Sequence, residues 1–205
     1  MINFTDITDI TGLASSAVAI IALVVLLPGV ARLQKTHFAL LVCAIAIVVL
    51  IPFGGLPLAA YVRGWMGDLS ITSLLLLLMS ILRPLCGRPP FDPKGRTTLL
   101  ILVALAAFGL YPMALGTSLF DPYRLGYGDP WLLGGLLLLA LAACFRQLPL
   151  LALAIALSIF TWGAGWYEST NLWDYLLDPL LAIYAISALL KRASRLAVAQ
   201  FDRGG

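Results

Sequence analysis

Charged residues are scarce in this chain of 205 residues, where they make up 11% of the sequence, against about 25% in an average soluble protein. A soluble chain of similar length leaves roughly 30% of its unfolded surface in water after folding, and charged side chains cover much of it. The low charge content therefore excludes a soluble enzyme, a disordered chain and a nucleic-acid-binding protein. We expect no nucleic acid among the partners of this protein.

Histidine is nearly absent too, since His37 is the single one in the chain. One histidine cannot form an H-E-x-x-H zinc pair or a multi-histidine metal site. Retinal binding would need a lysine inside the last apolar segment, but Lys191 ends that segment. No P-loop or dinucleotide-binding motif is present. The sequence thus predicts no metal and no cofactor, and it favours a protein that is not an enzyme.

Cysteine is rare as well, with three residues, Cys43, Cys86 and Cys144. All three fall within apolar segments or at their ends, and none lies in a loop that we assign to the outer side of a membrane. A disulfide framework of the kind found in small secreted proteins is therefore excluded. Free cysteine commonly packs as a small apolar side chain, which explains these three.

Apolar residues dominate instead, at 61% of the chain, with a mean hydropathy of +1.00. A transmembrane helix needs about 20 mostly apolar residues, and seven segments meet or approach this length. They cover residues 11–31, 38–60, 69–86, 97–116, 130–145, 148–166 and 175–190. The sequence predicts an all-α polytopic integral membrane protein with about seven transmembrane helices. We expect residues 1–205 to form a single transmembrane domain, with no soluble domain.

The basic residues assign the two sides of the membrane. Eleven of the 13 lysines and arginines, Arg88 among them, follow the first, third, fifth and seventh segments, and basic loops stay in the cytoplasm. The opposite side has only Arg63 and Arg124, but it carries eight of the 10 acids. Those acids are Asp6, Asp9, Asp68, Asp121, Asp129, Glu168, Asp174 and Asp178. We expect a multi-pass protein of a bacterial inner membrane, with its N-terminus outside and its C-terminus in the cytoplasm.

Three helical hairpins follow the first segment in this arrangement, and two of their returning helices begin with a shared pattern. Residues 61–68 read YVRGWMGD, and residues 123–129 read YRLGYGD. With one gap, the pattern aligns Tyr61 with Tyr123, Gly64 with Gly126, Trp65 with Tyr127, Gly67 with Gly128 and Asp68 with Asp129. We also expect contacts between membrane helices at small residues. Examples are Ala14, Ser15, Ser16, Gly134 and Gly135.

Aromatic residues concentrate on the outer side, where all five tryptophans fall. Two interpretations stay open: a belt of rings at the level of the lipid headgroups, or an aromatic-lined groove for a partner or an amphipathic ligand. The two outer arginines pair with nearby acids or headgroups, or they hold a lipid phosphate through two hydrogen bonds. The candidate ligand-binding residues are Arg63, Arg124, Trp65, Tyr127, Trp131, Trp166 and Trp173.

Four carboxylates on the outer side are the candidate catalytic residues, namely Asp129, Glu168, Asp174 and Asp178. Asp129 directly precedes a proline, a pattern typical of a helix N-cap. If the last helix starts near Tyr175, Asp174 and Asp178 lie one turn apart on one face. With Glu168 they would form an acid cluster that acts as general acid and base or binds a hard cation. The alternative is a set of solvated acids at the membrane interface.

Three functions are compatible with these features. The first, which we favour, is a non-catalytic accessory or assembly subunit of a cell-envelope enzyme or transporter, with the lipid bilayer and another membrane protein subunit as partners. The second is an enzyme or binder for a lipid-linked sugar or a phospholipid headgroup at the outer leaflet, using paired carboxylates. The third is a small transporter or flippase built on helices broken by glycine and proline. The first two place the functional surface on the outer, periplasmic face.

Overall fold

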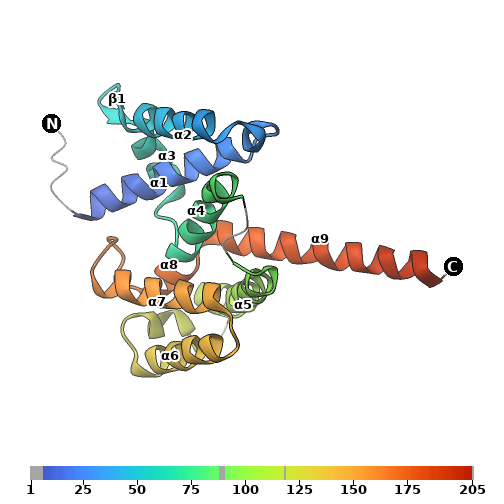
Figure 1. The fold of residues 1–205 in the computed structure, drawn as a ribbon. Coiled ribbons are helices and arrows are strands. Elements are labelled where there is room, and N and C mark those ends of the chain that lie inside the picture. Colours follow the sequence, from blue (N-terminus) through green and yellow to red (C-terminus); the bar gives the residue numbers. More distant parts are fainter. Residues whose placement is uncertain (1–6, 88–90, 118, 205) are drawn as a thin grey trace.

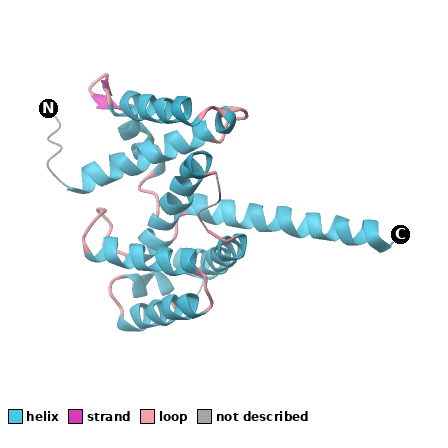
Figure 2. Cartoon of the chain, viewed as in Figure 1, coloured by secondary structure: helices cyan, strands magenta, loops and turns pink. Residues whose placement is uncertain are grey.

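The computed structural model describes residues 7–87, 91–117 and 119–204, which are mostly helical (Figure 1, Figure 2). The all-α prediction is confirmed. Each of the seven apolar segments contains one long helix. These helices are α1 (Ile7–Val25), α2 (Lys35–Leu50), α4 (Ile71–Cys86), α5 (Pro93–Pro112), α6 (Pro130–Phe145), α7 (Pro149–Gly163) and α9 (Pro179–Gly204). Two of the charges assigned above to a membrane side, Asp6 and Arg88, lie outside the described residues.

Two of the long helices have the length and composition needed to cross a membrane. The apolar windows are Thr8–Val25 in α1 and Pro93–Gly116, which begins with α5. Helices α2, α4 and α6 have 16 residues each and α7 has 15, so they are about 22–24 Å long. That length is shorter than the hydrocarbon core of about 30 Å, so these four helices are apolar but shorter than a typical transmembrane helix.

A tight hairpin interrupts the segment that we expected to be helical over residues 38–60. Helix α2 ends at Leu50, and strands β1 (Pro52–Phe53) and β2 (Leu56–Pro57) pair antiparallel after it. Gly54 and Gly55 form the turn with φ angles of 64° and 97°. Two adjacent residues at positive φ are typical of a type I′ turn, which closes two-residue hairpins. The prediction of a helix is therefore wrong for residues 51–57. A separate short helix, α3 (Leu58–Met66), follows.

Short helices precede three of the long helices. Helix α3 precedes α4, η3 (Pro122–Gly126) precedes α6, and α8 (Leu172–Leu176) precedes α9. The first two short helices carry the repeated sequence pattern. Gly67 and Gly128, which the pattern aligns, have φ angles of 73° and 90°, a backbone conformation that favours glycine. In both copies of the repeat, a short helix is thus followed by a glycine at positive φ shortly before a long helix begins. Two further short elements, η1 (Val30–Arg32) and the turn η2 (Met113–Thr117), follow α1 and α5.

The last segment breaks where we expected a continuous helix starting near Tyr175. Helix α8 ends at Leu176, Leu177 is extended with φ −146° and ψ 138°, and α9 begins at Pro179. Helix α9 then continues past Lys191 to Gly204, for 26 residues. Asp174 and Asp178 consequently belong to different elements, and the prediction that they share one helical face is wrong.

The helices form two groups (Figure 1). In the first, α1 packs against α2, α3 and α4; in the second, α5 packs against α7 and α9, and α6 packs against α7. The expected hairpins would pair α5 with α6 and α7 with α9. The structure instead packs α5 against α9 and α6 against α7. Buried alanines allow this close packing, with Ala107 on α5, Ala154 on α7 and Ala185 on α9. Helix α4 joins the two groups through contacts with α7 and α8.

The expected small-residue contacts are divided between buried and exposed positions. Ser15 and Ser16 are buried on α1, but Ala14 on the same helix is exposed. Gly134 and Gly135 on α6 are also exposed, and no side chain lies within 4 Å of where their Cβ atoms would be. The two glycines of α6 therefore make no close packing contact within the described chain.

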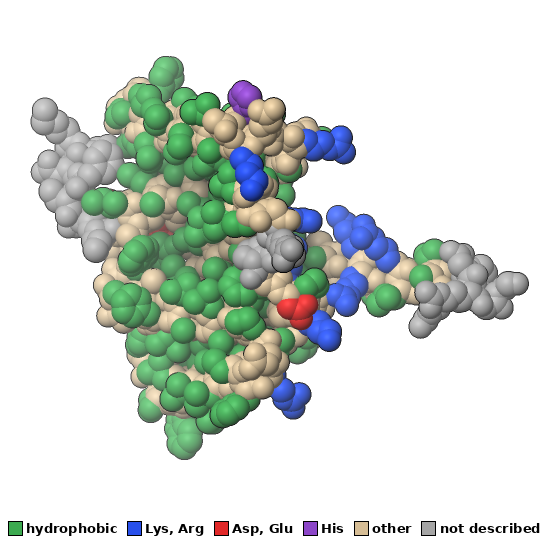
Figure 3. All heavy atoms as spheres, in the orientation of Figure 1, with side chains coloured by type: hydrophobic (Ala, Val, Ile, Leu, Met, Phe, Trp, Pro, Cys, Tyr) green, Lys and Arg blue, Asp and Glu red, His purple; other side chains and the backbone are tan. Residues whose placement is uncertain are grey.

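Charge separates the two ends of the molecule. In the space-filling view, lysine and arginine side chains gather at one end, which we call the basic end (Figure 3). The opposite end, where α4, α6 and α9 begin, carries most of the acids, and we call it the acidic end. The last turns of α9 project beyond the other helices at the basic end (Figure 1).

Candidate functional site

Asp178 links the first turns of two helices at the acidic end. Its side chain is 6% exposed, and one carboxylate oxygen accepts hydrogen bonds from the Ser70 N–H (3.0 Å), the Ser70 hydroxyl (2.6 Å) and the Ser73 hydroxyl. The other oxygen accepts from the Leu181 N–H at 2.8 Å. Ser70 caps α4 and Leu181 lies in the first turn of α9. A negative charge is favoured at helix N-termini, so Asp178 is a joint cap that connects the two helix groups.

Asp174 is held by a tyrosine from a distant loop. The Tyr123 hydroxyl lies 2.9 and 3.0 Å from the two carboxylate oxygens, and the Ser169 hydroxyl donates at 2.5 Å. Burial, followed by the hydrogen bond to Asp174, raises the pKa of Tyr123 above its ordinary value. The phenol therefore stays protonated and remains a donor. Two more contacts join the same loops: the Asn171 amide donates to the Tyr123 carbonyl (2.9 Å) and the Trp173 indole to the Pro122 carbonyl (3.0 Å).

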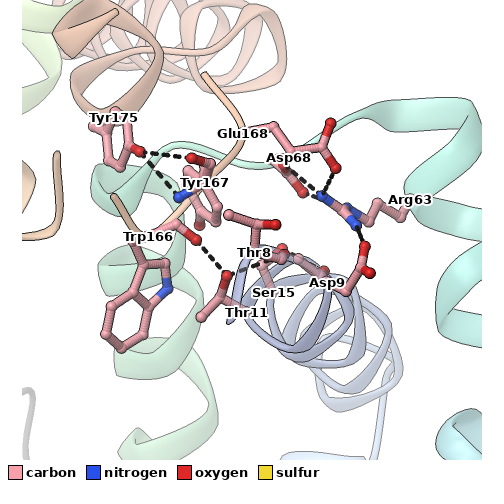
Figure 4. A network of polar contacts seen from close by, with 11 residues as sticks. Thr8, Asp9, Thr11, Ser15, Arg63, Asp68, Trp166, Tyr167, Glu168 and Tyr175 are labelled. Atoms are coloured by element: carbon pink, nitrogen blue, oxygen red, sulfur yellow. Dashed lines mark hydrogen bonds and ion pairs between the residues drawn. The ribbon is translucent and has the colours of Figure 1, made fainter. Parts of the chain in front are cut away.

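Arg63 on α3 binds three carboxylates from three parts of the chain (Figure 4). Two nitrogens of its guanidinium donate to Asp68 at 2.7 and 3.1 Å, and further bonds reach Asp9 on α1 (3.2 Å) and Glu168 (3.0 Å). The Arg63 side chain is 17% exposed, but that of Glu168 is 69% exposed. The hydrogen bond to Asp68 is the main reason why the pKa of Arg63 is raised above its ordinary value. We call Arg63 with these acids the Arg63 cluster.

The loop that carries Glu168 is fastened from both helix groups (Figure 4). On one side, the Thr11 hydroxyl of α1 donates to the Trp166 carbonyl. On the other, the Tyr175 hydroxyl of α8 accepts from the Tyr167 N–H (2.9 Å) and donates to the Ser169 carbonyl (3.0 Å). Residues 166–169 therefore bridge α1 and α8 by hydrogen bonds, in addition to the ion pair between Glu168 and Arg63.

The candidate catalytic acids do not come together in one site. Glu168 binds Arg63, Asp174 binds Tyr123 and Ser169, and Asp178 binds the two serines of α4. Asp129 accepts from the Trp131 and Leu132 N–H groups at 2.8 and 3.4 Å, which confirms its prediction as an N-cap. The sequence reasoning overlooked Ser70 and Ser73. Their signal is a serine pair three residues apart at the start of an apolar run, as expected for a capped helix.

The candidate ligand-binding aromatics lie at separate places around the acidic end. Trp65 on α3 is 85% exposed and Trp131 on α6 is 86% exposed, and these two helices belong to opposite sides of the molecule (Figure 1). Tyr127 and Trp166 are also exposed, and Trp173 is half-buried against the core of the second helix group. Arg124 is exposed, and no ion pair involves it among the described residues.

A hollow of about 430 Å³ adjoins the Arg63 cluster. All four members of the cluster line it, together with apolar residues such as Leu13 and Leu56. Within the described part of the chain, no group of three or more histidine, cysteine, aspartate or glutamate residues is placed to hold a metal ion. The Arg63 guanidinium itself supplies the positive charge between the three acids.

The fold and these contacts define a class of protein. It is an all-α chain with two helices able to span a membrane, and its acidic end is held together by internal hydrogen bonds and ion pairs. Comparison with known proteins assigns no family within this class, because no protein-family model, curated protein or solved structure matches the chain. The contacts at the two ends of the molecule are therefore the basis for a function.

We expect Gly126→Ala to disrupt the contact between η3 and α8. A Cβ atom on the buried Gly126 would collide with the Asn171 side chain and lie 2.7 Å from the Trp173 ring. Overpacking of this kind lowers the free energy of unfolding by about 1–3 kcal/mol. Thermal unfolding of the purified protein in detergent measures the loss.

Gly134→Ala is the matched control for this substitution. Gly134 lies inside α6 with open space at its Cβ position, and alanine is favoured over glycine in a helix by roughly 0.8–1 kcal/mol. The control should therefore unfold at the same temperature as the wild type or slightly higher. Equal unfolding temperatures for the two variants would show that the contacts around Gly126 are loose.

Proposed function

We propose that this chain is a multi-pass protein of a bacterial inner membrane, with the acidic end in the periplasm, that acts as a non-catalytic accessory or assembly subunit of a cell-envelope enzyme or transporter. One observation carries the proposal. The carboxylates Asp174, Asp178 and Glu168 of the acidic end are bonded within the chain, whereas the tryptophans Trp65 and Trp131 at the same end are exposed.

The internal bonding of the carboxylates favours a structural role over catalysis. A general acid or base must reach a proton of the substrate. Asp178 is buried under four hydrogen bonds, and Asp174 is held by Tyr123 and Ser169. Glu168 is exposed, but it is paired with Arg63. These acids hold the loops and helix ends of the acidic end in place.

Exposed apolar side chains on the helices support a position within the bilayer. Large examples are Ile47 on α2, Phe108 on α5 and Leu138 on α6, and hydrophobic side chains cover much of the visible face (Figure 3). Extended apolar surface is rare on soluble monomers, and lipid tails would cover it here. Since basic loops stay in the cytoplasm, the basic end faces the cytoplasm and the acidic end faces the periplasm.

Helix α6 offers the surface best suited to a partner helix. Trp131 is exposed at its periplasmic end, and Gly134 and Gly135 follow with open space above them. Small residues let two membrane helices approach closely, and tryptophan is enriched among the residues that dominate binding energy at protein interfaces. We therefore place the partner subunit against α6.

Site-specific photocrosslinking in native membranes tests this placement. A photoreactive amino acid at Leu138 on α6 should form an adduct with one membrane protein, and the same probe at Ile47 on α2 should label lipid only. Gly134→Leu should abolish the Leu138 adduct by blocking the helix approach, whereas Gly134→Ala should preserve it. The proposal fails if Leu138 yields only lipid adducts, or if the same protein is labelled equally from Ile47.

A further inference from the structure

A second, larger hollow lies at the basic end, far from the Arg63 cluster. It has a volume of about 1,320 Å³ and is lined by α1 and α4 from one helix group and by α5 and α9 from the other. This volume exceeds the roughly 300–1,000 Å³ of typical small-molecule sites. The two helix groups are joined at the acidic end by Asp178 and the Arg63 cluster. At the opposite end this groove lies between them.

The groove has an excess of positive charge. Among the side chains that the structure describes, five basic ones line it, and no aspartate or glutamate does. The lining bases are Arg83, Arg96, Lys191, Arg192 and Arg195. All ion pairs of the described side chains belong to Arg63, so these five bases have no acidic partner in that part of the chain. Neutral partners orient two of them: Arg96 donates to the Tyr184 hydroxyl and Arg192 to the Thr97 hydroxyl. A bound anion would supply the missing negative charge.

The wall of the groove changes from apolar to basic along each helix. On α4, Leu76 and Met79 are followed by Arg83; on α5, Leu100 lies one turn deeper than Arg96. On α9, Ala188 precedes Lys191 and Arg192. The three helices thus present apolar side chains deep in the groove and basic side chains at its mouth. This order matches a molecule with an anionic headgroup and apolar tails.

We propose that this groove binds one anionic phospholipid of the cytoplasmic leaflet. The headgroup phosphate lies among the arginines, which form paired hydrogen bonds to phosphate, and the acyl chains lie against Leu76, Met79 and Leu100. A free phosphate would leave the apolar wall uncovered, and a neutral lipid would leave five positive charges without a counterion. The orientation in the membrane comes from the proposed function, but the bound lipid does not depend on a partner subunit.

Native mass spectrometry of the purified full-length chain tests the proposal. After incubation with phosphatidylglycerol, we expect one lipid bound per chain, and an equal concentration of phosphatidylcholine or inorganic phosphate should leave no such adduct. The double variant Arg83→Gln/Lys191→Gln removes two groove charges that make no hydrogen bond within the described chain. Because each base near an anionic lipid contributes a similar increment of binding free energy, affinity for phosphatidylglycerol should fall about 30-fold.

The matched control is Lys94→Gln/Arg146→Gln. It removes the same two residue types from exposed positions at the same end, but outside the groove, and it should bind phosphatidylglycerol like the wild type. Equal losses in the two double variants, or equal binding of phosphatidylcholine, would overturn the proposal. Displacement of the lipid by inorganic phosphate alone would show an anion site without a lipid. Partner crosslinking at Leu138 is a separate readout, so its failure would leave this result unchanged.

Discussion

Asp178→Ala is expected to lower the free energy of unfolding by about 4 kcal/mol or more, the largest effect that we foresee for one substitution. The change leaves the Ser70 and Leu181 N–H groups and the hydroxyls of Ser70 and Ser73 without their acceptor. Hydrogen bonds to a charged group contribute roughly 1.5–3 kcal/mol each, although such contributions do not simply add. Thermal and denaturant unfolding in detergent, together with the amount of protein recovered from membranes, measures the loss.

Asp92→Ala is the control for Asp178→Ala. Asp92 also stands directly before a proline and begins a helix, but it is exposed and its side chain caps nothing. Its replacement should change stability by no more than about 0.5 kcal/mol. Asp178→Asn should give an intermediate loss, because the amide keeps one acceptor oxygen but turns an NH₂ group towards one set of donors. If Asp178→Ala unfolds like Asp92→Ala, the joint cap does not stabilise the fold.

Arg63→Gln is expected to have the second largest effect, because it leaves Asp9, Asp68 and Glu168 close together without a positive charge. Most of the lost free energy of unfolding comes from Asp68, since its two hydrogen bonds to Arg63 are partly buried. The exposed pair with Glu168 contributes little, as surface ion pairs usually do. We expect a loss of about 2–3 kcal/mol. Arg63→Lys should recover part of it, because lysine restores the charge but not the paired hydrogen bonds.

Limited proteolysis distinguishes the effect of breaking the Arg63 cluster from the effect of removing any positive charge at the acidic end. Chymotrypsin cleaves after aromatic residues, and Trp166 and Tyr167 lie in the loop that Arg63 fastens through Glu168. Cleavage there should be faster in Arg63→Gln than in the wild type. Arg124→Gln removes the other arginine of the acidic end, which is exposed and without an ion pair among the described residues. Arg124→Gln is therefore the control and should be cleaved at the wild-type rate. If Arg63→Gln is also cleaved at that rate, the cluster does not fasten the loop.

Local features were predictable from the sequence because they depend on neighbouring residues. Apolar run length located a long helix in each of the seven segments, and aspartate before proline identified the cap of α6 at Asp129. The repeated pattern at 61–68 and 123–129 was visible in the sequence, but the short helices α3 and η3 in which it lies were not predicted. The turn at Gly54 and Gly55 shows the limit of this reasoning, because an apolar run concealed the hairpin within it.

The sequence by itself determined the composition, the helical class, the approximate positions of the seven long helices and the separation of acids from bases. Only the tertiary structure decided which helices pack together, because apolar helices look alike in sequence and their pairing depends on how small residues such as Ala154 and Ala185 fit. It also decided the partners of Arg63 and Asp178. Ser70 lies 108 residues from Asp178 along the chain, and a buried carboxylate takes whichever donors the packed helices bring to it.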